Sequence, residues 1–162
     1  MKKLLCVFAA VAAAGYLGLL PFDAHDVADI IPAQTCFIMK DGTQYVVDVG
    51  AGVKAVGDTL KKALDALQEQ TAGSVFFGTC EQVVLAGDTE TLLADIARED
   101  AFRPAAKVYT ADAPLDIDGV SAYLHSHPGG VTVSDARAAA AEGTQISVPK
   151  ILPTDGGYRT VA

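Results

Sequence analysis

An uncharged run from Leu4 to Leu20, directly after Lys2 and Lys3, constrains this chain more than any other feature. A basic start followed by an apolar stretch is typical of a segment that directs a chain to or across a membrane. As a helix the run would rise about 26 Å at ~1.5 Å per residue, close to the ~30 Å hydrocarbon core of a bilayer. Residues 1–21 are therefore predicted to be a signal anchor or signal peptide that Pro21 ends.

An uncleaved anchor is favoured over a cleaved signal peptide and over a buried core helix of the domain. Small residues suited to cleavage, Ala12 to Ala14, are followed by further apolar residues up to Leu20. A buried core helix would show a polar face, and this run shows none. The lysine pair orients the N-terminus toward the cytoplasm. We therefore expect a single-pass membrane protein with its domain on the extracytoplasmic side.

The remaining residues, 22–162, are enough for one domain and too few for two. The chain is 51% hydrophobic and 20% charged, which indicates a globular protein. Its net charge of -8 argues against nucleic acid as a partner, because phosphate recognition needs clustered Lys and Arg. We interpret the negative charge as one that keeps the exposed domain soluble.

Hydrophobic patterning predicts an α/β domain with a mixed, largely antiparallel sheet and helices packed on one face. Asp41-Gly42-Thr43 predicts a hairpin between strands at 35–40 and 44–49. Further strands are expected at 74–77, 82–86, 106–110, 144–152 and 158–161, and helices at 22–31, after Asp88, at 116–124 and at 135–142 with Ser134 as N-cap and Gly143 just beyond.

The clearest helix follows Asp58, which we expect to cap it. Its apolar residues recur at the spacing of one helix face: Leu60, Ala63, Leu64 and Leu67. We expect this face to pack against the sheet.

Two cysteines, Cys36 and Cys80, fall in apolar surroundings within the domain. In an oxidising compartment a disulfide between them is one interpretation. The other is that both are free buried thiols, since unpaired cysteine is among the most buried residue types. Cys6 lies inside the apolar run, which does not suit lipid attachment.

The segment His125-Ser126-His127-Pro128 resembles the metal core of JAMM-type metallopeptidases, in which two histidines bind zinc. That family continues with a serine and a ligating aspartate. Here Ser134 comes one residue early and Arg137 stands where the acid should be. Asp135 would have to be the third ligand, and Glu81 would be the upstream acid.

We instead interpret both histidines as polar residues of a solvated loop. The sequence also lacks a G-x-S-x-G elbow and a phosphate-binding glycine loop. We therefore predict a chain that is not an enzyme, with no catalytic, cofactor-binding or metal residues. A secreted zinc metallohydrolase using His125 and His127 is the alternative.

Several motifs follow one another in a recognisable order. They are Phe22-Asp23-Ala24-His25-Asp26-Val27, Val75-Phe76-Phe77-Gly78, Val83-Val84-Leu85-Ala86-Gly87, Arg98-Glu99-Asp100-Ala101-Phe102-Arg103-Pro104 and Lys107-Val108-Tyr109-Thr110. Their order resembles the N-terminal domain of Ger(x)C-type spore germination proteins, the C subunits of germinant receptors. Pro21 stands where that family has its lipid-bearing cysteine, and the chain stops near Tyr158, where family members continue.

The resemblance implies an extracytoplasmic interaction module related to spore germination or sporulation. Its expected partners are the membrane, through residues 4–20, and other membrane or receptor subunits. A binding protein for a small ligand is a further possibility, because pockets are not readable from sequence.

Overall fold

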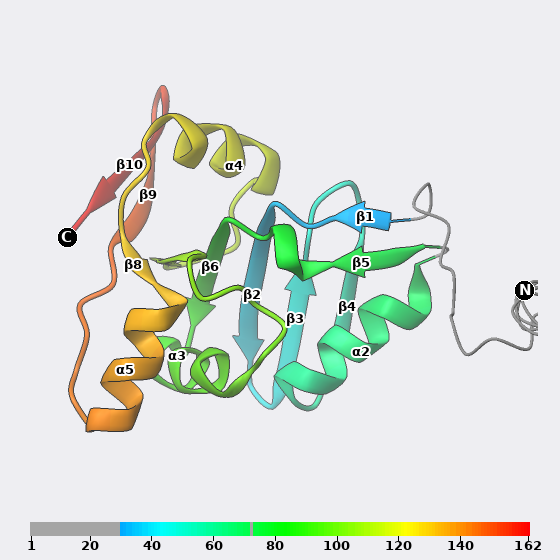
Figure 1. Ribbon diagram of the computed structural model, residues 1–162. Helices are drawn as coiled ribbons and strands as arrows, with labels where there is room; N and C mark the ends of the chain where they lie inside the picture. The colour runs from blue at the N-terminus through cyan, green and yellow to red at the C-terminus, as the bar shows by residue number, and fades with distance from the viewer. Residues whose placement is uncertain (1–29, 72) are drawn as a thin grey trace, which may run out of the picture.

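The computed structural model describes residues 30–71 and 73–162, which form a mixed α/β domain (Figure 1). Eight strands make one mixed sheet, in the order β10-β9-β7-β6-β2-β3-β4, with β8 paired to β7. Strands β1 and β5 form a separate parallel pair. The strand bounds are β1 Ile30–Pro32, β2 Thr35–Asp41, β3 Gln44–Asp48, β4 Lys54–Gly57, β5 Ser74–Phe76, β6 Gln82–Gly87, β7 Lys107–Ala111, β8 Val131–Thr132, β9 Lys150–Thr154 and β10 Gly157–Val161.

Four α-helices and one 3-10 turn accompany the strands in the described part of the chain. They are α2 Leu60–Gln70, the turn η2 Phe77–Thr79, α3 Thr89–Arg98, α4 Ile117–Ser126 and α5 Val133–Glu142. Each α-helix begins at a side-chain N-cap: Thr59, Asp88, Asp116 and Thr132. Thr132 and Asp135 form a capping box, and Gly143 ends α5 with φ 67°, a left-handed value that suits glycine.

The sheet is antiparallel at its edges and parallel in its centre. The pairs β2–β6, β6–β7 and β7–β9 are parallel, whereas β2–β3, β3–β4, β9–β10 and β7–β8 are antiparallel. The prediction of a mixed sheet is confirmed, but its largely antiparallel character is limited to the edges. Helix α3 connects β6 to β7, which is how parallel neighbours are usually joined.

Helices pack on both faces of the sheet, so the expectation that they cover one face is wrong. Alternate residues of the central strands face opposite clusters: Val83 and Leu85 of β6 lie with the apolar faces of α2 and α3, and Val84 and Ala86 lie with α4. A strand buried on both sides reads as a continuous apolar run. The continuous apolar sequence of β6 therefore indicates that helices cover both faces of the sheet.

Several expectations about single elements need correction. Ile30 and Ile31 belong to strand β1 and not to a helix, and the rest of the predicted 22–31 helix lies outside the described residues. Thr59, not Asp58, caps α2, and Thr132, not Ser134, caps α5. The strand expected at 144–152 is present only from Lys150, where β9 begins, and strand β4 was not predicted at all.

No helix within residues 30–71 and 73–162 is long and apolar enough to cross a membrane. The predicted membrane segment at residues 4–20 lies outside the described residues.

Candidate functional site

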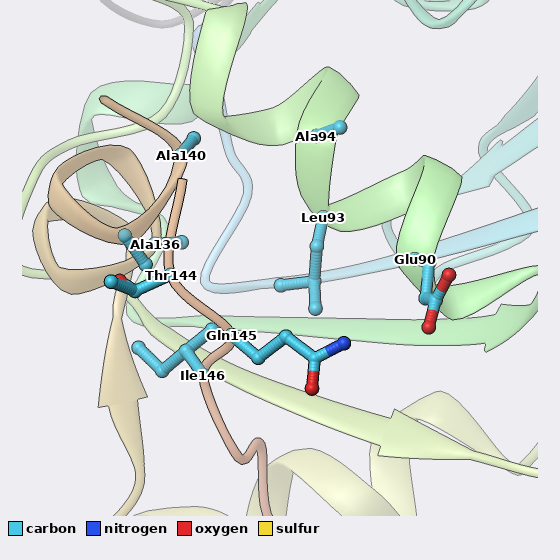
Figure 2. A pocket seen from close by; sticks show the side chains of 9 residues that line it. Glu90, Leu93, Ala94, Ala136, Ala140, Thr144, Gln145 and Ile146 are labelled. Carbon is cyan, nitrogen blue, oxygen red and sulfur yellow. The ribbon is translucent and has the colours of Figure 1, made fainter. Parts of the chain in front are cut away.

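A groove of about 380 Å³ lies between α3 and α5, and Figure 2 shows it from close by. Leu93 of α3 points toward the segment that follows α5, where the Gln145 side chain extends toward Glu90, and Ile146 lines the groove beside it. The small side chains of α5 complete the wall: Ala136, Ala139 and Ala140. The groove is thus an apolar surface with a polar edge.

The groove exists because α5 presents alanines to α3. Leu92 and Ile96 of α3 turn inward and are fully buried, but Leu93 is only partly buried and is left facing the alanines. Arg137 of α5 donates a 2.7 Å hydrogen bond to the carbonyl of Glu99, which fixes α5 against the end of α3. The small side chains of α5 therefore leave a groove here, while the hydrogen bond from Arg137 keeps α5 attached to the end of α3.

Exposed apolar side chains gather on the β1–β5 pair. Ile30, Pro32 and Phe76 form what we term the β1–β5 patch; Ile30 is 38% exposed and Phe76 51%, and Pro32 lies opposite Phe76 in the register. The alternate residue, Val75, is 2% exposed and belongs to the core. The pair therefore buries one face and offers the other to a partner.

The patch is held in a fixed shape. The side-chain oxygen of Gln68 accepts a 2.9 Å hydrogen bond from the Val75 amide, and its side-chain nitrogen donates to the Val75 carbonyl. Helix α2 is thus hydrogen-bonded to the backbone of β5. The Phe76 ring lies over Gly78, where a Cβ would overlap the ring and displace it. Phe76 is thus packed on one side while half of it stays exposed.

A polar cleft of about 470 Å³ opens at the amino ends of β2 and β6, beside α4. Two of its lining residues, Gln82 and Ser121, contact the buried Thr35: Thr35 Oγ1 lies 2.7 Å from Gln82 Oε1 and 2.8 Å from Ser121 Oγ. Thr35 and Gln82 are 4% and 7% exposed, the only buried polar or charged residues in the described part of the chain.

The mouth of this polar cleft carries ionisable and amide side chains. Glu81 and Asp118 contribute carboxylates, and His125 and Gln34 complete the lining together with Ala122. The Glu81 backbone is fixed on both sides, since its amide donates to the Gln34 carbonyl and its carbonyl accepts from Lys107. The carboxylate therefore projects from a rigid position.

The structure separates the residues of the predicted His-x-His motif. His125 lies in the last turn of α4 and lines the polar cleft, so the expectation of a loop holds only for His127, the C-cap. His127 Nδ1 is 3.0 Å from the Tyr123 carbonyl and its ring stacks on Tyr123. Asp135 is engaged in the capping box, where hydrogen bonds from Thr132 lower its pKa.

Among residues 30–71 and 73–162, no three His, Cys, Asp or Glu side chains come together as a metal site. We expect purified protein to hold no stoichiometric zinc, since a catalytic zinc needs three protein ligands. Replacing both His125 and His127 by alanine should change the free energy of unfolding by less than about 1 kcal/mol, because both are exposed. Elemental analysis that finds one zinc per chain, lost in the double variant, would contradict this prediction.

Cys36 and Cys80 are free, fully buried thiols in the same core cluster. The Cys80 thiol donates to the Gln82 carbonyl at 3.2 Å. Burial raises the pKa of Cys80 to about 12 and, together with the nearby Cys80 thiol, raises that of Cys36. Neither is suited to act as a nucleophile, because the thiolate is the reactive form.

In a Cys6→Ser variant we expect Cys36 and Cys80 to resist a thiol reagent at pH 8 until the protein unfolds. In the folded protein the pKa values of both thiols lie above the ordinary value of 9.0, so the thiols stay protonated where an unfolded chain would ionise. Their contribution to the free energy of unfolding is therefore fully present below pH 9 and is lost as the pH rises toward about 12. Thiol titration with and without denaturant measures this. Equal rates in both conditions would contradict the burial of the two cysteines.

Sequence reasoning missed the place of three residues on these surfaces. Nothing in the sequence marks Leu93 as a groove residue, Phe76 appears there only as part of an aromatic motif, and Gln82 only as the start of an apolar strand. Gln82 gave a signal that could have been used: a long polar side chain opening a strand with an otherwise apolar sequence needs buried hydrogen-bond partners.

Comparison with protein-family models, with curated proteins and with solved structures finds no match to this chain.

Proposed function

We propose that the chain is a non-catalytic, membrane-tethered interaction module on the extracytoplasmic side, related to spore germination or sporulation. The basic and apolar start of the sequence supports the tether, and the motif order that resembles Ger(x)C proteins supports the biological setting. The observation that carries the interaction role is the β1–β5 patch, where the half-exposed ring of Phe76 lies on a strand pair beside Ile30 and Pro32.

The position of the patch suits contact with a membrane-embedded partner. The chain from Pro21 to Ile30 spans at most about 32 Å at ~3.6 Å per residue, so the patch stays close to a bilayer that holds residues 4–20. A pre-organised aromatic side chain costs little entropy on binding. Buried aromatic anchors also contribute strongly to protein interfaces.

Charge favours a protein partner over the lipid surface. The chain carries a net charge of -8, so it lacks the clustered Lys and Arg that attract a protein surface to anionic lipid headgroups. The β1–β5 patch itself contains no cation to offset this repulsion. We therefore assign the patch to the membrane-proximal surface of a receptor subunit.

The α3–α5 groove lies at the other end of the domain from β1 and β5 (Figure 1). Its apolar floor and the acidic Glu90 at its rim suit an apolar side chain flanked by a basic residue on a second protein. An adaptor that touches a membrane subunit at one end and another protein at the other would use both surfaces.

The proposal requires residues 4–20 to remain attached. We expect mass spectrometry of the membrane fraction to find a chain that retains them, because the apolar run continues past the alanines to Pro21. A mature N-terminus between Ala14 and Pro21, with the protein in the soluble fraction, would contradict the tether.

The germination role can be tested in an endospore-forming source. Deleting the gene should slow nutrient-triggered germination, and the unaltered gene should restore the rate. A Phe76→Ser variant should fail to restore it, whereas Glu69→Gln, an exposed change on α2, should succeed. Matching thermal melts would show that both variants fold. Normal germination of the deletion strain would overturn the proposed function.

A further inference from the structure

We propose that β4 binds an extended segment of a partner protein, which adds a strand to the open edge of the sheet. This surface is distinct from the β1–β5 patch, and the inference goes beyond the role proposed above. It rests on the unpaired backbone groups of β4, on the contrast between the two edges of the sheet and on the exposed apolar side chain of Val56.

The outer side of β4 presents free backbone groups. Val49 donates its amide to the Val53 carbonyl at 3.0 Å, so these two residues form a hydrogen-bonded pair where the chain turns from β3 into β4. Hydrogen-bonded and non-bonded pairs alternate along antiparallel strands. The register therefore turns the amides and carbonyls of Lys54 and Val56 away from β3.

The β2–β3 hairpin gives the same result independently. Its two-residue turn closes on the pair Asp41–Gln44. Two residues further along β3, Val46 also lies in a hydrogen-bonded pair and directs its backbone groups to β2. It therefore has none for Val56, its neighbour in β4. Strand β3 is the one described strand that pairs with β4, so the outward groups of β4 have no partner among the described residues.

The opposite edge of the sheet is protected. By the same alternation Thr160 of β10 turns its amide outward, and this amide donates to the Tyr123 hydroxyl at 3.0 Å. Tyr123 also packs near Tyr158, so α4 covers part of this edge. Proteins usually protect edge strands, because unpaired backbone groups attract another strand. A domain that protects one edge and leaves the other open offers the open one for strand addition.

The exposed side chains of β4 define the partner strand. Val56 is 47% exposed and continues an apolar row that Met39 and Val46 begin on the same face of the sheet. An apolar residue opposite Val56 would extend this row. Lys54 lies two residues earlier, on the same face and exposed, which favours an acidic residue opposite it.

The other face of β4 sets a size limit. Ala55 is 3% exposed in the core cluster that includes the apolar face of α2, and a Cβ on Gly57 would come within 2.5 Å of the Ala63 nitrogen. Helix α2 thus lies directly on this face of β4 (Figure 1). We therefore expect the partner strand to carry an apolar, a small and an acidic residue in succession, with the small one facing α2.

Hydrogen exchange of the full, isotope-labelled chain in detergent tests the edge, with the peptide acetyl-Thr-Val-Ser-Glu-Ser-Val-Thr-amide as probe. Without peptide, the Lys54 and Val56 amides should exchange faster than the Ala55 amide, which is bonded to β3. The peptide should slow exchange at Lys54 and Val56 saturably and leave Ala55 unchanged. A peptide with lysine in place of glutamate should bind about three-fold or more weakly, because like charges would face each other at Lys54.

Two variants identify the edge. Lys54→Glu should reverse the preference, so that the lysine peptide binds more tightly than the glutamate peptide. Arg159→Glu, the same change of charge at an exposed position of β10, should leave the preference unchanged. Val56→Pro removes an outward amide while the bonds to β3 stay in place, so peptide binding should be lost without a large change in the thermal melt. If Val56→Pro does not fold, the reversal by Lys54→Glu still decides.

Three results would overturn the proposal. The first is protection of the Val56 amide before any peptide is added, which would show that another part of this chain or a second copy already occupies the edge. The others are unchanged exchange at Lys54 and Val56 in excess peptide, and the same peptide preference in Lys54→Glu and Arg159→Glu. None of these results bears on the germination phenotype of Phe76→Ser, so the two proposals fail separately.

Discussion

Phe102→Ala should lower the free energy of unfolding by about 3 to 5 kcal/mol, the range for removing a buried phenylalanine. Phe102 is 1% exposed, and its ring meets Phe77 edge to face with 5.6 Å between centroids. Truncation therefore leaves a cavity in the larger core cluster and also removes a favourable aromatic pair.

Phe76→Ala is the matched control for this measurement, because it removes the same ring from a side chain that is 51% exposed. We expect Phe76→Ala to lower the free energy of unfolding far less than Phe102→Ala does, because a ring that is half exposed in the folded state contributes little through burial. Urea denaturation of both variants measures the difference. Equal midpoints would show that Phe102 does not lie in the core.

Leu64→Ala should destabilise the domain by about 2 to 5 kcal/mol. Leu64 is 5% exposed and is a central member of the apolar face of α2, which packs in the same cluster as Ile38 and Val47. Loss of its side chain leaves a cavity between helix and sheet.

Lys62→Ala tests whether this loss is specific to the buried face of α2. Lys62 pairs with Asp58 at 3.0 Å, but both side chains are more than half exposed. Such pairs contribute about 0.3 to 0.5 kcal/mol, so Lys62→Ala should leave the free energy of unfolding nearly unchanged. Equal denaturant midpoints for Leu64→Ala and Lys62→Ala would contradict the orientation of α2.

The elements that the sequence predicts well are those whose own residues decide their structure. Asp41-Gly42 predicts the β2–β3 hairpin because the turn needs positive φ, and Gly42 has φ 58°. The stripe from Leu60 to Leu67 predicts the buried face of α2 because helical spacing alone places these residues together.

The elements that the sequence predicts poorly depend on distant partners. Ile30 and Ile31 sit at helical spacing from earlier residues, but they pair with Ser74 and Val75, which no local pattern reveals. Strand β4 is short, and it is held by β3 and by contact with α2 more than by its own sequence. Tertiary contacts decide both cases.

The candidate sites show the same division. His125 and Glu81 attract notice in the sequence as metal-binding types, yet their common position on the polar cleft follows from α4 crossing the ends of β2 and β6. The groove beside Leu93 arises from the alanines of α5, which individually suggest only helix formation. Neither surface is a property of one segment.

Cross-linking from position 76 tests the central claim most directly. A photoreactive phenylalanine analogue would replace Phe76 in the full chain in living cells, and the same analogue at Glu69 would serve as the control, because both positions are exposed. We expect position 76 to yield an adduct with a membrane-embedded germinant-receptor subunit, and position 69 to yield none. Adducts with phospholipid alone, or equal yields from both positions, would contradict the proposal that this domain is tethered at the membrane to bind another membrane protein through its β1–β5 patch.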